Sequence, residues 1–197
     1  IGLRGVQSSS QQQINRDFIF IEGLDANKAT TISSSNITVV DIDDTVTVHL
    51  KNLTISGTGQ YAITAGRGAT LYAESLIVEN AGNGITVHDG GIAYLSDITV
   101  SATSNAVLVT RNGTAKIYNN SLLQNSPGGL TVYYGSHAQV DNSTIKGNQL
   151  GVYMKQASLD VYGSTISNNT EDGFLLHHNS SAEINNSNIL SNARDGL

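Results

Sequence analysis

A repeat of about 22 residues runs through this chain and limits the folds that it can adopt. Each repeat has one hydrophobic anchor residue that follows a short polar stretch. The anchors are Ile32, Ile55, Val78, Val100, Leu123, Ile145, Ile166 and Ile189. Successive anchors are 21 to 23 residues apart. A period of this length is typical of proteins in which every repeat buries its apolar face against the next repeat. The chain is therefore expected to be an elongated stack of equivalent units.

Each repeat contains three short segments in which apolar and polar residues alternate. The third segment carries the anchor. The first segment is clearest at residues 84–87, 129–132, 151–154 and 173–176. The second segment is clearest at residues 46–50, 69–73, 157–161 and 182–184. Alternation with a period of two indicates strands with one buried face. Three such strands per repeat can bury their apolar faces only if the chain coils and each coil pairs in parallel with the next, about 4.8 Å along the axis.

These patterns predict an all-β fold, a right-handed single-stranded parallel β-helix of about eight coils with three short strands per coil. Composition agrees, because 13% charged residues, 20 glycines and one proline suit short strands and tight turns better than a helical bundle. We expect residues 31–197 to form the repeats of a segment truncated from a longer protein. Residues 1–30 are then an N-terminal segment or the first coils, with a strand at residues 18–21 and a polar loop at residues 8–13.

Two columns of turn residues follow the same period. Three positions before the anchors stand Asn52, Ser75, Asp97, Asn120, Asn142, Gly163 and Asn186. Asparagine tolerates a left-handed backbone and bonds to its own turn, so we expect the asparagines of this column to be structural and to hydrogen-bond between coils. The second column is Gly84, Gly129, Gly151, Gly173 and Gly196. We expect these glycines at the turn into the first strand, with positive φ.

The asparagine column and the Gly-hydrophobic-x-hydrophobic phrase resemble those of the right-handed parallel β-helix, or pectin-lyase-like, superfamily. The resemblance covers the chain from about residue 30 to its end. The superfamily includes polysaccharide lyases, hydrolases, epimerases, phage tailspikes and autotransporter passenger domains. The resemblance therefore implies the fold and leaves the function open.

Two phrases resemble those of pertactin-like autotransporter passenger domains. They are Gly66-Arg67-Gly68-Ala69-Thr70-Leu71 and His88-Asp89-Gly90-Gly91. In contrast, the chain lacks the Gly-His-Gly and Arg-Ile-Lys phrases of polygalacturonases, the Asp-Pro-His-Asp phrase of alginate epimerases and the Arg-x-Pro-x-x-Arg phrase of pectate lyases. Both observations favour a surface protein over an enzyme of known type.

One acidic cluster is the candidate for catalysis or metal binding. Alternation places Asp41 and Asp43 on one face of a strand, about 7 Å apart, which is a separation that inverting glycosidases use. Together with Asp44, the two carboxylates are also a candidate calcium site. The alternative is a solvated strand end that leads into a turn.

The outward face of the first strands is the candidate binding surface. Its column of side chains should contain His88, Thr110, Tyr133, Lys155 and His177, with Tyr153 in the neighbouring column. The rung spacing of about 4.8 Å is close to the length of a sugar unit, and Tyr133 and Tyr153 can stack on sugar faces. The alternative is an ordinary exposed sheet, since threonine and tyrosine are common on any strand. On the second strands, Tyr72 and Tyr94 should stack on each other.

Charge and composition exclude several other functions. A net charge of −6 and scattered basic residues argue against a nucleic-acid partner. The chain has no cysteine, which removes disulfides and thiol catalysis, and no apolar run is long enough to span a membrane. We expect no cofactor.

Three functions remain open. The first is a non-catalytic segment of a bacterial adhesin or autotransporter passenger, secreted or held at the cell surface, that presents a binding face to a host or matrix glycan or protein. The second is a polysaccharide lyase or glycosidase that uses Asp41 and Asp43. The third is a structural module that self-associates through its strand edges. We favour the first, because the constant repeat length after Ile55 leaves no long loops to enclose a substrate.

Overall fold

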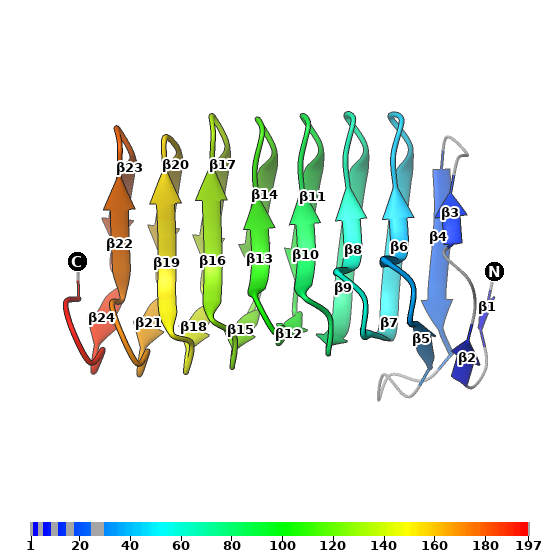
Figure 1. Ribbon diagram of the computed structural model, residues 1–197, viewed down its shortest axis with the longest axis horizontal. Coiled ribbons are helices and arrows are strands. Elements are labelled where there is room, and N and C mark those ends of the chain that lie inside the picture. The colour runs from blue at the N-terminus through cyan, green and yellow to red at the C-terminus, as the bar shows by residue number, and fades with distance from the viewer. Residues whose placement is uncertain (1, 4–5, 9–11, 15–17, 25–29, 197) are drawn as a thin grey trace.

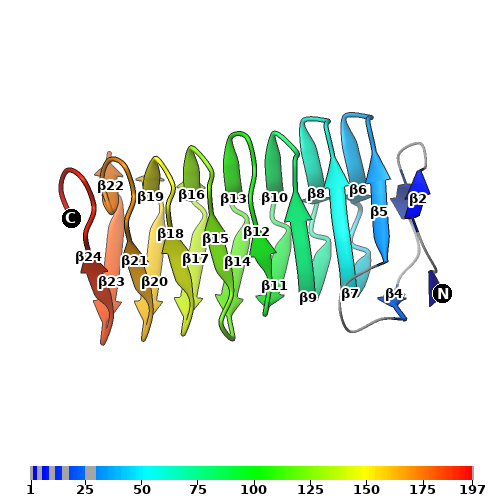
Figure 2. The ribbon, with the colours of Figure 1, turned by 90° about the horizontal axis from the view of Figure 1, so that it is seen from below.

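The fold is a rod of stacked β-coils with the two ends of the chain at its two ends (Figures 1 and 2). The computed structural model describes residues 2–3, 6–8, 12–14, 18–24 and 30–196. Within these residues the chain forms a right-handed parallel β-solenoid of about seven turns, with about 22 residues in each turn and no helix. The predicted fold class is confirmed.

The first strand of each coil belongs to an eight-stranded sheet, which faces the viewer in Figure 1. Its members are β3 (Gln12–Ile14), β6 (Thr38–Ile42), β8 (Tyr61–Ala65), β10 (Asn83–Val87), β13 (Asn105–Val109), β16 (Gly128–Tyr133), β19 (Leu150–Lys155) and β22 (Phe174–His177). Neighbouring strands pair in parallel. Strand β3 corrects the expected polar loop at Gln12 and Gln13, because these residues pair with Val40 and Asp41 of β6. Residues 9–11 of the expected loop lie outside the described residues.

The second and third strands together form a sixteen-stranded sheet that bends around the rod. The second strands are β1 (Gly2–Leu3), β4 (Phe18–Gly23), β7 (Thr47–Gly57), β9 (Thr70–Glu79), β11 (Ile92–Ser96), β14 (Thr114–Tyr118), β17 (His137–Asp141), β20 (Ser158–Tyr162) and β23 (Ser181–Asn185). The third strands are β2 (Val6–Ser8), β5 (Thr31–Ser34), β12 (Thr99–Val100), β15 (Leu122–Gln124), β18 (Thr144–Lys146), β21 (Thr165–Ser167) and β24 (Asn188–Leu190). Strands β7 and β9 continue through the bend, so each serves as the second and the third strand of its coil. The expected strand at residues 18–21 is part of β4.

The anchors form one internal row, as the repeat predicts. Each anchor pairs with the anchor of the next coil, from Ile32 and Ile55 to Ile166 and Ile189. All of them are buried except Ile189, which packs against the core from the last coil. The repeat of apolar residues is therefore the repeat of one continuous core.

The predicted column of left-handed turn residues is confirmed. Each of its seven members has a φ between 45° and 61° and bends the chain from the second strand into the third. Among non-glycine residues, asparagine and aspartate adopt this conformation at the least cost, which explains why they fill five of the seven positions, the others being Ser75 and Gly163. Their side chains are mostly exposed, and Asn142 is one example. Sharper turns, with one or two left-handed residues, join the first strand to the second, as at Asp89 and Gly90.

The second glycine column has a different cause from the one that we expected. None of its described members has a positive φ. Gly84, Gly129, Gly151 and Gly173 are required because the interior is crowded where the first strand begins, whereas Gly196 at the end of the rod has open surroundings. A Cβ atom at Gly151 would lie 2.5 Å from the carbonyl oxygen of Gly173 and 2.7 Å from Nδ2 of Asn169. The sequence pattern was read correctly as structural, but the prediction of positive φ was wrong.

Gly151→Ala is therefore expected to lower the free energy of unfolding by about 2 kcal/mol, because the methyl group cannot fit without displacing backbone. Urea denaturation followed by circular dichroism measures the change. The matched control is Gly196→Ala, whose Cβ would meet Ile189 at an ordinary 3.4 Å. Equal effects for the two variants would contradict the crowding argument.

A second asparagine row, inside the rod, holds the loops between third and first strands together. The backbone N–H of Ser126 donates to Oδ1 of Asn148 at 3.0 Å, and the N–H of Asn148 donates to Oδ1 of Asn169 at 3.0 Å. Asn169 in turn donates from Nδ2 to Oδ1 of Asn192 at 2.9 Å. Asn148 and Asn169 are buried. The ladder of hydrogen bonds between asparagines thus lies three residues after the anchors. In the predicted column, Asn52 donates from Nδ2 to Oε1 of Glu22 in the preceding coil at 3.4 Å, and the column as a whole shapes the bend.

Candidate functional site

The predicted binding residues lie in register on the outer face of the eight-stranded sheet. Tyr133 of β16 pairs with Lys155 of β19, and Lys155 pairs with His177 of β22. Tyr153 occupies the adjacent column, two residues before Lys155 on the same strand. Because alternate residues of a strand face the same side, these four side chains share one surface.

Aromatic rings make contact across three rungs of this surface. The ring centroids of Tyr133 and Tyr153 are 5.3 Å apart with planes at 90°, and those of Tyr153 and His177 are 5.5 Å apart with planes at 75°. Tyr134, which begins the next turn and is 48% exposed, lies 5.5 Å from Tyr133, and Nζ of Lys155 lies 5.7 Å from its centroid. We call Tyr133, Tyr134, Tyr153, Lys155 and His177 the tyrosine face. Its perpendicular rings cannot all stack on one another, so their faces point in different directions.

A hollow of about 340 Å³ adjoins the tyrosine face. It is lined by Ser104, Asn105, Pro127, Gly128, Thr131, Tyr133, Gln149, Leu150 and Tyr153. Gly128 makes room for it, since a Cβ atom there would lie 2.4 Å from Oδ1 of Asn105. Thr131 donates to that oxygen at 2.6 Å, and Asn105 donates from Nδ2 to Oδ1 of Asn83 at 2.8 Å. The floor is thus a fixed amide and hydroxyl network beside two aromatic rings.

The phenol of Tyr133 stays neutral in this setting. Burial against Tyr153 and Tyr134 raises the pKa of Tyr133 to about 12. Its hydroxyl can therefore donate a hydrogen bond at any physiological pH.

His88 and Thr110 occupy earlier rungs of the same column but do not join the tyrosine face. Thr110 is only 8% exposed and offers little area to a ligand. Nδ1 of His88 lies 2.9 Å from Oδ2 of Asp89, whose carboxylate also accepts two hydrogen bonds from Arg111, at 2.6 and 3.0 Å. The Arg111 guanidinium holds the pKa of Asp89 well below its usual range. His88, Asp89 and Arg111 thus form a hydrogen-bonded cluster at the turn, with Arg111 and Asp89 as its ion pair.

The acidic cluster at the N-terminal end of this sheet is also engaged with its neighbours. The hydroxyl of Thr64 donates to Asp41, and the guanidinium of Arg67 lies 3.3 Å from Asp43 and 3.4 Å from Asp44. Within the described residues, no group of three or more His, Cys, Asp or Glu side chains is placed to hold a metal ion. The structure thus places a hydrogen-bond or ion-pair partner from the next coil beside each of Asp41, Asp43 and Asp44, and their metal or catalytic role stays a prediction.

A second aromatic row lies on the outer face of the second strands. Tyr72 and Tyr94 stack as predicted, with centroids 4.9 Å apart and planes at 9°. A hollow of about 300 Å³ beside them includes Glu74, whose carboxylate is 2.8 Å from Lys51 and 3.6 Å from His49. Because the two tyrosine rings cover each other's faces and Glu74 is already paired, this row is a weaker site than the tyrosine face.

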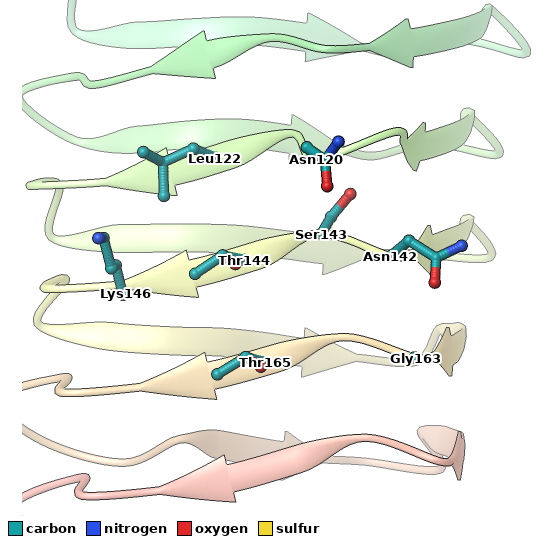
Figure 3. Close-up of a pocket in the computed structure, with 8 residues that line it drawn as sticks. All are labelled: Asn120, Leu122, Asn142, Ser143, Thr144, Lys146, Gly163 and Thr165. Carbon is teal, nitrogen blue, oxygen red and sulfur yellow. The ribbon is translucent and has the colours of Figure 1, made fainter.

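A wider hollow of about 440 Å³ follows the bend between second and third strands (Figure 3). Asn120, Asn142 and Gly163 of the turn column line it on one side, and side chains of β15, β18 and β21 line it on the other. Lys146 is its only charged residue and Leu122 its only large apolar one. This open polar surface follows from the bend and lacks an aromatic ring.

Sequence reasoning placed Tyr133, Tyr153, Lys155 and His177 together and missed several of their neighbours. Tyr134 was missed because the turn that carries it is outside the strand pattern. Asn105 and Gln149 were missed because they flank strands rather than face outward within them. The register of Asn105 with Gly128 is the signal that could have found the hollow.

The described residues contain no helix that is long and apolar enough to cross a membrane. A search of curated proteins finds no significant match. In contrast, the family model described as "Right handed beta helix region" matches residues 38–189. This match spans most of the chain and coincides with the coils described above. The chain therefore belongs to the right-handed β-helix family.

Proposed function

We propose that the chain is a non-catalytic β-helix segment of an extracellular or cell-surface protein, such as an adhesin or autotransporter passenger domain, and that its tyrosine face binds carbohydrate. The observation that carries the proposal is the pairing of perpendicular tyrosine rings with a hollow floored by amide and hydroxyl groups. Sugars present both apolar C–H faces and hydroxyl groups. The C–H faces pack on aromatic rings, and the hydroxyl groups exchange hydrogen bonds with amides such as those of Asn105 and Gln149.

The shape of the rod supports binding rather than catalysis. Turns of one or two left-handed residues join the first and second strands, so no long loop rises beside the tyrosine face. Enzymes gain much of their rate from enclosed, dry sites that hold charged groups in place. An open ladder with rungs about 4.8 Å apart suits an extended polymer that lies along the surface.

Tyr153→Ala is expected to weaken glycan binding about tenfold. Without the ring, the complex buries about 50 Å² less apolar surface between protein and sugar, which at about 25 cal/mol per Å² weakens binding by about 1.3 kcal/mol. A glycan array with the whole chain identifies ligands, and calorimetry with the best ligand measures the change.

Tyr72→Ala is the matched control, because it removes an exposed tyrosine from the opposite sheet and should leave affinity unchanged. The proposal fails if the two variants bind alike or if no glycan is bound. Turnover on a polysaccharide panel that is lost in Asp41→Asn and Asp43→Asn would instead establish an enzyme.

A further inference from the structure

We infer that the tyrosine face selects glycans that carry an anionic group, a carboxylate or a sulfate, and that Lys155 and His177 bind that group. This inference rests on the proposed function and goes beyond it, because aromatic rings and amides alone would bind neutral sugars equally well.

The first support is that Lys155 has no carboxylate partner in the described part of the chain. Most other described basic side chains are neutralised at short range: Lys51 lies 2.8 Å from Glu74, Arg111 2.6 Å from Asp89, and Lys116 3.2 Å from Asp141. Arg67 and Arg194 are paired in the same way. In a chain with a net charge of −6, a lysine that faces no acid is an exception. Its charge is available to a ligand.

The second support is the position of Lys155 relative to the rings. Lys155 follows Tyr153 by two residues on β19 and shares its face, so the two Cα atoms are about 7 Å apart by strand rise. A sugar packed on Tyr153 would thus place a substituent of the same or the next ring near the ammonium group. Tyr134 also contacts the lysine, with Nζ 5.7 Å from its ring centroid.

The third support is His177, which is exposed and continues the column one rung beyond Lys155. The titratable groups that face it are Tyr153 and Lys155 on β19 and His178 in its own turn, with ring centroids 5.5 Å from Tyr153 and 5.9 Å from His178. No carboxylate of the described residues forms an ion pair with it. A ring N–H of His177 is therefore available to donate a hydrogen bond to an anionic group of a ligand.

The experiment compares lactose, 3′-sialyllactose and 3′-sulfolactose, together with neutral and anionic versions of other backbones, on one array. We expect the anionic versions to bind about tenfold more tightly than the neutral ones. Lys155→Gln should abolish the preference, and His177→Ala should reduce it, because no ring N–H remains to donate. Lys146→Gln is the matched control, because Lys146 likewise has no carboxylate partner among the described residues but lies in the hollow at the bend.

The outcomes separate the two proposals. Equal binding of neutral and anionic versions, with loss in Tyr153→Ala, overturns the anionic selectivity and leaves the glycan-binding face intact. A preference that survives Lys155→Gln, or that Lys146→Gln removes, also overturns it. Sialylated and sulfated versions show which acid group is bound. The absence of any glycan binding overturns both proposals.

Discussion

Ile145→Ala is expected to lower the free energy of unfolding by about 3 to 4 kcal/mol. Ile145 is 1% exposed and lies in the anchor row between Leu123 and Ile166. Its Cγ2 also fills the space beside Gly129, where a Cβ atom would lie only 2.5 Å away. The alanine variant loses apolar contact and leaves a cavity that backbone hydrogen bonds on both sides prevent from closing. This loss of stability is large because each coil contributes few residues to the core, so one truncated side chain removes a large part of the packing in that coil.

The effect of Ile145→Ala should be local. Stability in a solenoid is close to a sum of coil-to-coil contacts, so the coils on either side of Ile145 should open first. Urea denaturation gives the total change, and amide hydrogen exchange locates it. Lys146→Ala, on the exposed face of the same strand, is the control and should change stability by less than about 0.5 kcal/mol. Exchange that rises equally in every coil would contradict the local picture.

Asn169→Ala is expected to cost about 3 kcal/mol, although it removes a polar side chain. The substitution leaves the buried N–H of Asn148 without its acceptor and Oδ1 of Asn192 without one of its donors. A buried polar group that loses its partner costs about 1 to 3 kcal/mol, and the missing amide adds a cavity next to Gly151. Asparagine at this position therefore stabilises the core rather than the surface.

The control for Asn169→Ala is Asn142→Gly, in the other asparagine column. Asn142 is exposed and has a φ of 45°, and the equivalent residue of the next coil is Gly163. Glycine adopts this conformation freely, so the change should be within about 0.5 kcal/mol. Calorimetric unfolding of both variants compares the two columns directly. A cost at Asn142 that equals the cost at Asn169 would show that the two rows have the same role.

The fold could be predicted because the positions that repeat along the chain accept few residue types. The anchors must be apolar, and the bend three residues earlier needs a left-handed residue, so both columns are visible without coordinates. The role of Gly151 and its equivalents could not be predicted in the same way. Glycine is used both for positive φ and for close approach, and the sequence pattern is the same for both. The φ of Gly151 and the atoms packed against it distinguish the two uses. The ladder of Asn148, Asn169 and Asn192 was hidden by the more numerous asparagines on the surface.

For the candidate site, the sequence predicts only what the strand register determines, which is the set of residues that lie next to one another. Counting residues placed Tyr133, Lys155 and His177 in one column, because strand pairing fixes which residues are neighbours. Three features depend on side-chain rotamers and turn geometry: the angle between the rings of Tyr133 and Tyr153, the hollow at Gly128, and the contacts that engage Asp43 and His88. The alternation pattern contains no information about those. The acidic cluster consequently looked more available in the sequence than it is beside Arg67.

The constant length of the coils has a consequence for how such a protein can change. Each coil brings the same interior rows into contact, so an entire coil can be removed or duplicated between equivalent residues while the side chains that meet inside stay the same. Outward residues such as Tyr153 take no part in those rows. The distance from a binding face to either end of the rod is thus adjustable in increments of about 4.8 Å, independently of what that face recognises.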